Sequence, residues 1–255
     1  MGIVLTIANQ KGGVAKTTTA VNLSAALALE GKKVLLVDLD PQGNATSGMG
    51  IEKKAGMRCI YDVIINEYPI ERACLDTGID GFKILPATIQ LAGAEVELVG
   101  MPNREKKLKE ALAQIKDKFD FILIDCPPSL GLLTLNGLTA SNGALIPVQC
   151  EYYALEGLGQ LLNTINLVRK HLNPKLEIFG ALLTMQDFRT NLSNQVAEEV
   201  RSFFRDKVFE QGISRNVRLS EAPSYGLPIA LYDARSKGAE QYKNLAQEVI
   251  ARVKS

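Results

Sequence analysis

Short, continuous apolar runs alternate with segments of helical spacing along the chain of 255 residues. Runs with little apolar–polar alternation are typical of strands that are covered on both faces. These runs lie at 3–8, 33–40, 82–87, 119–128, 143–149 and 177–185. The helical patterns lie at 16–31, 104–118, 131–140, 155–171, about 191–205 and about 238–253. The repetition predicts one α/β domain over 1–255, with a mostly parallel, twisted sheet flanked by helices on both faces.

The composition excludes few classes of function. Hydrophobic residues make up 46% of the chain and charged residues 22%, and 29 basic side chains nearly balance 28 acidic ones. The balance predicts that any nucleic-acid site is a local patch. No run approaches the roughly 20 apolar residues that span a bilayer, and the first residues do not resemble a signal peptide. We therefore expect a cytoplasmic protein without a membrane partner, whose four cysteines are reduced thiols.

A glycine-rich turn, QKGGVAKTT at 10–18, follows the first predicted strand and opens the first predicted helix. This context is that of a P-loop, where main-chain amides and a helix N-terminus converge on phosphate. Lys16 is expected at the β- and γ-phosphates of ATP or ADP, and the Thr17 hydroxyl at Mg²⁺. The residues expected to surround the nucleotide here are Gly12, Gly13, Val14, Ala15, Lys16, Thr17 and Thr18. The domain is thus predicted to be a P-loop NTPase.

The turn departs from the common pattern G-x-x-x-x-G-K-[ST], because Gln10 replaces the first glycine and Lys11 follows it. It resembles K-G-G-x-G-K-[ST], the signature of the deviant Walker A family of ATPases. In that family the extra lysine reaches across a dimer interface to the nucleotide of the partner. The resemblance implies the same catalytic contact for Lys11.

Ala15 stands where that signature has glycine. If the loop needs a positive φ here, alanine carries a strain of about 1 kcal/mol, and its methyl group lies close to the phosphates. One alternative is therefore a nucleotide-binding module with impaired hydrolysis.

Aspartates end two of the predicted strands. Asp38 and Asp40 lie at the end of 33–40, and residues two apart on a strand face the same side. Asp40 is the candidate for orienting the attacking water and joins Thr17 in the Mg²⁺ site. Asp38 is expected to support a Mg²⁺-bound water or the loop lysine. Asp125 ends an apolar strand in the manner of a Walker B motif and is expected to hold Mg²⁺.

With these residues in place, the chain resembles ParA-type partition ATPases of the chromosomal, Soj-like branch. The matching segments include VLLVDLDPQGNATSG, FILIDCPPSLGLLTLN, LLTMQDFRTNLS and RNVRLSEAPSYG. The resemblance implies an ATP-dependent homodimer that binds DNA without sequence preference and is nucleoid-associated. It also implies slow ATP hydrolysis that a ParB-type partner protein stimulates, and a role in chromosome or plasmid partitioning.

The resemblance also assigns residues outside the loop. It places Arg189 and Arg218 at DNA, Met185 and Asn216 around the adenine, and Glu151 near the dimer interface. The sequence itself supports DNA binding less directly, since basic residues of the C-terminal part are interleaved with acidic ones. They form a patch only if folding gathers them: Arg189, Arg201, Arg205, Lys207, Arg215, Arg218, Arg235 and Lys237.

Two related families provide alternatives. MinD-like ATPases bind membranes through a C-terminal amphipathic helix, but the tail YKNLAQEVIARVKS lacks bulky aromatics and dense basic residues. A final helix packed on the core is favoured instead. The nitrogenase iron protein carries an iron–sulfur cluster between its subunits. Cys126 follows Asp125, but a bridging cluster needs two cysteines per subunit near the dimer axis, and 86–102 offers none.

Overall fold

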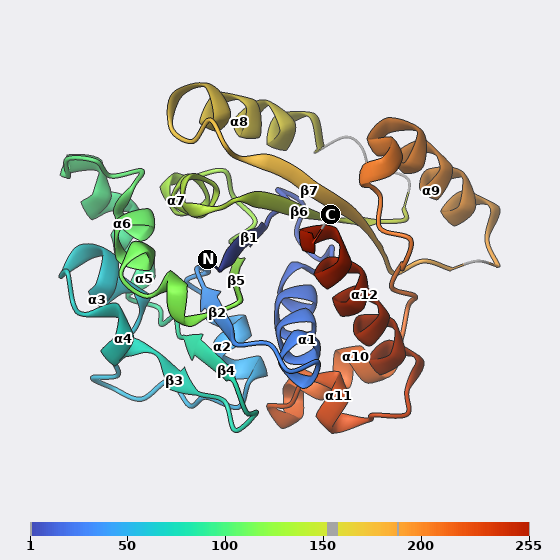
Figure 1. Ribbon diagram of the computed structural model, residues 1–255, viewed down its shortest axis with the longest axis horizontal. Coiled ribbons are helices and arrows are strands. Elements are labelled where there is room, and N and C mark those ends of the chain that lie inside the picture. The colour runs from blue at the N-terminus through green and yellow to red at the C-terminus, as the bar shows by residue number, and fades with distance from the viewer. Residues whose placement is uncertain (1, 152–157, 188, 255) are drawn as a thin grey trace.

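The computed structural model describes residues 2–151, 158–187 and 189–254. Its centre is a twisted seven-stranded sheet of order β3-β4-β2-β5-β1-β6-β7 (Figure 1). Every neighbouring pair is parallel except β3 and β4, which are antiparallel. The strands are β1 (Ile3–Ile7), β2 (Val34–Asp38), β3 (Leu75–Asp76), β4 (Phe82–Leu85), β5 (Phe121–Asp125), β6 (Gly143–Gln149) and β7 (Glu177–Thr184). The predicted α/β class with a mostly parallel sheet is confirmed.

Helices cover both faces of this sheet (Figure 1). One face carries α3 (Ile60–Ile65), α4 (Ile70–Ala73), α5 (Leu91–Glu97), α6 (Lys107–Ala113), α7 (Leu132–Ala140), α8 (Leu158–His171) and α9 (Asn191–Phe204). The opposite face carries α1 (Lys16–Leu29), α2 (Asn44–Gly48), α10 (Val217–Glu221), α11 (Ile229–Tyr232) and α12 (Lys237–Lys254). Short 3₁₀ turns are η1 (Leu98–Gly100), η2 (Lys116–Lys118), η3 (Arg205–Lys207) and η4 (Ala222–Tyr225).

All six predicted strands are present, and none of their ends is shifted by more than three residues. The helix expected at 155–171 is described from Leu158 onward, and 155–157 lie outside the described residues. The helix expected at 104–118 is shorter, because α6 ends at Ala113 and the chain continues through η2. The two-residue strand β3 and the short helices α2 to α5 were not predicted, because they are too brief to show a period.

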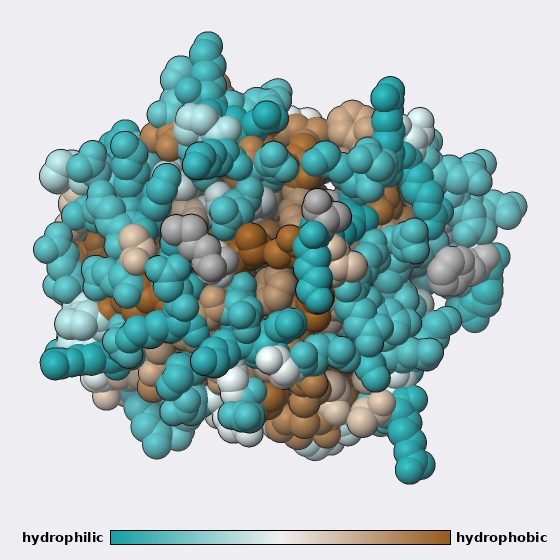
Figure 2. Space-filling view, viewed as in Figure 1, coloured by the Kyte–Doolittle hydropathy of each residue, from teal (hydrophilic) through white to brown (hydrophobic). Residues whose placement is uncertain are grey.

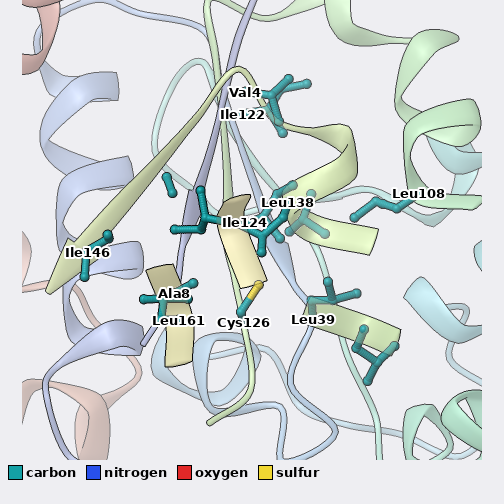
Figure 3. Packing of buried hydrophobic residues seen from close by; sticks show 14 of the residues in the cluster. Val4, Ala8, Leu39, Leu108, Ile122, Ile124, Cys126, Leu138, Ile146 and Leu161 are labelled. Carbon is teal, nitrogen blue, oxygen red and sulfur yellow. The ribbon is translucent and has the colours of Figure 1, made fainter. Parts of the chain in front are cut away.

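Residues of the central strands alternate between two separate cores. Ile122 and Ile124 of β5 enter the core beneath α7 and α8, whereas Leu123 enters the core beneath α1 and α12. Figure 3 shows Ile122, Ile124 and Cys126 spaced along the same face of the sheet, with Leu138 of α7 among them. Because both faces are buried, apolar residues are needed at every strand position, which explains the continuous runs in the sequence.

The last helix is part of the second core. Leu245 and Val249 of α12 are fully buried, and the Tyr242 hydroxyl lies 3.2 Å from the Thr19 hydroxyl of α1. Val253, near the chain end, is 37% exposed. The prediction of a core-packed final helix is confirmed. Figure 2 shows hydrophilic residues over most of the face viewed, with apolar residues gathered in its middle and at its lower edge. Among the described helices, none has the length and apolar character required to cross a bilayer.

The register of the sheet brings three chain segments to one edge. Asp125 at the end of β5 is paired with Ile7 of β1 on one side and with Asp38 of β2 on the other. The residues that follow these three strands therefore emerge together, at the carboxyl edge where ligands of open α/β sheets bind.

Candidate nucleotide-binding site

The glycine-rich turn joins β1 to α1, as predicted. Gly13 and Ala15 both have left-handed backbone conformations, with φ of 74° and 66°, and α1 begins directly afterwards at Lys16. A β-carbon added at Gly12 or Gly13 would meet no atom within 4 Å. The turn thus leaves open space in front of the amides at the helix N-terminus, which is the shape required for a phosphate cradle.

Two side chains that the sequence did not indicate hold this turn in place. Asn9 donates from Nδ2 to the Pro147 carbonyl at 2.7 Å and accepts at Oδ1 from the Lys11 amide at 3.0 Å. The Thr184 hydroxyl donates to the carbonyl of buried Val14 at 3.1 Å. These bonds join the turn to the ends of β6 and β7, so the sheet fixes its position. The partners in these two bonds are separated by 138 and 170 positions in the sequence. No local pattern could reveal the bonds, because only folding brings such distant residues together.

Lys16 points back into the turn and is 7% exposed. Its Nζ donates to the Lys11 carbonyl at 3.0 Å. Burial lowers the pKa of this ammonium, and the nearby Asp125, Cys126 and Asp40 oppose the shift. Among the ion pairs of the described ranges Lys16 has none, and a buried cation of this kind is well placed to receive an anionic ligand.

Asp125 is fully buried, and within the described part of the chain neither of its carboxylate oxygens has a partner in hydrogen-bond geometry. Burial raises its pKa well above the ordinary value, Asp38 adds to the rise, and the neighbouring Thr17 hydroxyl opposes it. Buried polar atoms are rarely left unpaired, and such an exception indicates a missing partner. A carboxylate with a hydroxyl beside it offers the hard oxygen donors that Mg²⁺ prefers. The residues present therefore fit the predicted cation.

Asp38 differs from its expected role. Its Oδ2 accepts from the amide and the hydroxyl of Thr46, both at 2.7 Å, and its Oδ1 accepts from the Asp40 amide at 3.2 Å. The same Thr46 hydroxyl accepts from the Ala87 amide at 2.9 Å. The carboxylate thus joins β2 to α2 and to the segment after β4, rather than to the loop lysine. Burial raises its pKa from 3.8 to about 6.

Asp40 lies just past β2 and is 7% exposed. Its Oδ1 accepts from the Gln42 amide at 2.9 Å. Its charge acts on both Lys16 and Asp125, which shows that the three groups share one electrostatic environment. The structure therefore brings the predicted water-orienting carboxylate to the phosphate turn.

A cavity of about 330 Å³ adjoins the turn and is lined by residues from both ends of the chain. Met185 and Asn216, which were expected around the adenine, lie in its wall together with Ala15 and half-buried Thr18. Met185 has φ of 51° and its sulfur accepts from the Gln149 amide group at 3.2 Å. Further lining residues that the sequence did not suggest are Thr184, Ile213, Ser214, Arg215, Leu219, Ser220, Pro223 and Tyr242.

The two arginines expected at DNA are exposed and already paired within the chain. Arg189 forms a two-point ion pair with Asp187, at 2.9 and 2.8 Å, and holds the pKa of that carboxyl down to about 2. Arg218 contacts Glu221 at 2.9 Å. Glu151, expected at the dimer interface, is exposed and pairs with Arg215 at 3.1 Å.

The cysteines of the chain are free thiols: Cys59, Cys74, Cys126 and Cys150. Cys126 is buried next to Asp125, and burial strongly raises its pKa. Across 2–151, 158–187 and 189–254, no three His, Cys, Asp or Glu side chains are grouped so as to hold a metal ion.

Comparison with known proteins agrees with this geometry. The family model described as an AAA domain matches residues 2–178. A solved structure described as cobyrinic acid a,c-diamide synthase from Mycobacterium smegmatis, with bound ADP and magnesium, superposes with a TM-score of 0.88. It is 42% identical and the match covers 100% of this chain and 96% of that one.

The fold defines a P-loop NTPase, and the residues predicted to bind nucleotide and magnesium lie at the carboxyl edge of its sheet. The chain is 62% identical to the sporulation initiation inhibitor protein Soj of Bacillus subtilis, over 98% of this chain and 99% of Soj. It is 54% identical to the chromosome partitioning protein ParA of Myxococcus xanthus, over 99% and 89% of the two chains. The chain belongs to the Soj/ParA family of chromosome-partitioning ATPases.

Proposed function

We propose that this protein is an ATP-dependent dimerising switch that binds DNA without sequence preference and hydrolyses ATP slowly to drive partitioning of a chromosome or plasmid. The observation that carries the proposal is that two buried groups lie at one P-loop: among the residues described, the Lys16 ammonium contacts a carbonyl and no carboxylate, and the Asp125 carboxylate has no hydrogen-bond partner. Each group lacks a partner that a magnesium nucleotide supplies. Membership of the Soj/ParA family supports the partitioning role.

The chain's own residues suggest how the reaction proceeds. The amides of 12–18 and Lys16 hold the β- and γ-phosphates, and the cavity beside Ala15 accepts the base. Asp40 orients the attacking water, and Lys11 of a second copy neutralises charge on the phosphates. Bound Mg²⁺, held by Thr17 and Asp125 with Asp40 nearby, supplies positive charge to the transferring group.

Dimerisation gives the switch its output. Because Lys11 acts across the interface, the site is complete only when two copies face each other. Slow hydrolysis then limits how long the pair persists. A ParB-type partner that completes the site more fully would shorten that time. We place the switch in the cytoplasm, on the nucleoid.

DNA binding is assigned to a surface that includes Arg189 and Arg218. Both side chains are exposed, with side-chain exposures of 88% and 56%. When DNA binds, each arginine leaves its carboxylate partner within the chain and forms an ion pair with a DNA phosphate instead. Such contacts are sequence-independent and weaken steeply with salt.

Two alternatives predict different behaviour. A module impaired by Ala15 binds nucleotide and dimerises but releases no phosphate, with or without DNA and partner. A MinD-like membrane ATPase needs a free amphipathic tail, whereas Leu245 and Val249 of α12 are buried against α1. The packing of α12 therefore favours the DNA-binding reading.

The test is nucleotide affinity of the wild-type chain beside Lys16→Ala. ATP with Mg²⁺ should bind the wild type, and the variant should lose about 100-fold or more in affinity, since a charge-assisted contact to phosphate is removed. Equal affinity of the two proteins contradicts the assignment of the P-loop. Phosphate release measured with and without DNA then separates a switch from an inactive module.

A further inference from the structure

The segment after β2 forms a tight turn around Asp40. The Gln42 amide donates to Asp40 Oδ1 at 2.9 Å, and the Gly43 amide donates to the Asp40 carbonyl at 2.8 Å. The direction of the Asp40 carboxylate is therefore set by the shape of this turn. A short turn at a protein surface holds one shape only when contacts outside it restrict its dihedral angles.

One side chain from a later segment supplies such contacts. Lys53 donates from Nζ to the Gln42 carbonyl at 2.8 Å and to the Gly43 carbonyl at 3.3 Å. Two successive carbonyls of the turn thus face the same ammonium. Bonds from a charged donor are shorter and stronger than those between neutral groups.

The packing around Gly43 shows how closely the ammonium fits. Gly43 has φ of 62°, and a β-carbon added there would lie 2.9 Å from the Ala87 carbonyl and 3.0 Å from Lys53 Nζ. Glycine is needed both for the conformation and for the space. The turn is enclosed between the segment after β4 on one side and the Lys53 ammonium on another.

We propose that Lys53 is a positioning residue for hydrolysis, which fixes the 40–43 turn through two main-chain carbonyls and so aims the Asp40 carboxylate at the attacking water. The inference rests on the proposed role of Asp40 in the reaction. Lys53 touches neither phosphate nor water; it acts through the turn. Misplacement of a catalytic group by about 1 Å lowers a rate by roughly 100-fold, so a partial loosening is expected to cost about tenfold.

The turn itself is tested by hydrogen exchange on the nucleotide-free protein, which requires no ATPase activity. In Lys53→Met, which keeps the aliphatic stem, the Gln42 and Gly43 amides should exchange at least several times faster than in the wild type. Lys54→Met is the matched control, because the Lys54 side chain is 72% exposed. Its one ion pair within the described residues is with Glu52, at 3.2 Å. Unchanged exchange of these amides in Lys53→Met overturns the proposal.

The consequence for catalysis is tested by single-turnover hydrolysis. Lys53→Met should lower the rate about tenfold, with unchanged ATP affinity and unchanged ATP-dependent dimerisation. Lys53→Arg, which retains donors for both carbonyls, should recover most of the rate, and Lys54→Met should match the wild type. Equal rates for wild type and Lys53→Met, or an equal fall in affinity and rate, overturn the proposal. The proposed function fails on a different result. If neither the wild type nor an Ala15→Gly variant binds ATP, the proposed function is refuted, whatever the hydrogen-exchange data show.

Discussion

Asp38 and Asp125 are direct partners in the parallel register between β2 and β5, yet in the part of the chain that the structure describes only the Asp38 carboxylate accepts hydrogen bonds. Both side chains are fully buried. Two carboxylates this close repel each other when both are ionised, and burial adds to the cost. The pair is therefore a source of instability in the nucleotide-free protein, which we expect a bound cation to relieve.

This relationship predicts a pH dependence of stability. The folded state raises the pKa of Asp38 from 3.8 to about 6, so it binds more protons than the unfolded chain between these values. The stabilisation is fully present below about pH 4 and is lost as the pH rises through about 6. We expect the free energy of unfolding of the wild type to fall by roughly 1–3 kcal/mol across this window relative to Asp38→Asn.

Urea unfolding of both proteins from pH 4 to pH 7 measures this difference without nucleotide. The comparison with Asp38→Asn removes the effect of carboxyls whose pKa is lowered, such as Asp187, since both proteins share them. A difference that stays constant with pH contradicts the assigned shift. Magnesium nucleotide should flatten the wild-type profile, because a cation favours the ionised carboxylates.

Asp40→Ala separates binding from chemistry. The variant should bind ATP and dimerise like the wild type, because Lys16 and the turn at 12–18 remain. Its hydrolysis should fall by about 100-fold or more, since the group that orients water is gone. Phosphate release and nucleotide affinity measured on the same preparation check this. Loss of ATP binding in the variant would show that Asp40 holds the nucleotide rather than the water.

Charge reversal tests the DNA surface. Arg189→Glu and Arg218→Glu should each weaken DNA binding and reduce its salt dependence by about one ion, because each arginine neutralises one phosphate. Arg169→Glu is the control, since Arg169 is exposed in the last turn of α8. Filter binding across a salt series gives the slopes. Equal losses in all three variants would indicate a general effect of net charge.

Ala15→Gly tests the strain in the phosphate turn. Alanine at φ of 66° costs about 1 kcal/mol, while glycine makes the unfolded chain more flexible by about 0.4–1 kcal/mol. The variant should therefore be as stable as the wild type or slightly more stable. Ala251→Gly, at an exposed helical position in α12, should lose about 1 kcal/mol. Equal destabilisation of both variants in denaturant unfolding would rule out strain at Ala15.

The sheet could be predicted because its strands are covered on both faces. Runs such as 143–149 are apolar up to Gln149, and β6 occupies that range without a shift. The predicted strain at Ala15 also followed from the loop pattern, and the positive φ confirms its premise. Short elements without a period, such as α2 and β3, carry no comparable signal.

The site could be predicted only where its residues are close in sequence. The turn at 10–18 and the ends of two strands were enough to propose Lys16, Asp40 and Asp125, which the structure places at one edge of the sheet. The Asp38 carboxylate is bound by Thr46, and the turn after Asp40 is bound by Lys53. These contacts arise from folding of segments without a motif, so no spacing in the sequence reveals them.

Sedimentation of the chain with and without ATP and Mg²⁺ tests the central claim most directly. Asp40→Ala is expected to keep the nucleotide intact during the run, and Lys11→Ala is the comparison, since it removes the proposed contact across the interface. ATP should convert Asp40→Ala from one copy to two, while the double variant with Lys11→Ala binds ATP and stays single. A saturated Asp40→Ala protein that remains a single copy would contradict the account.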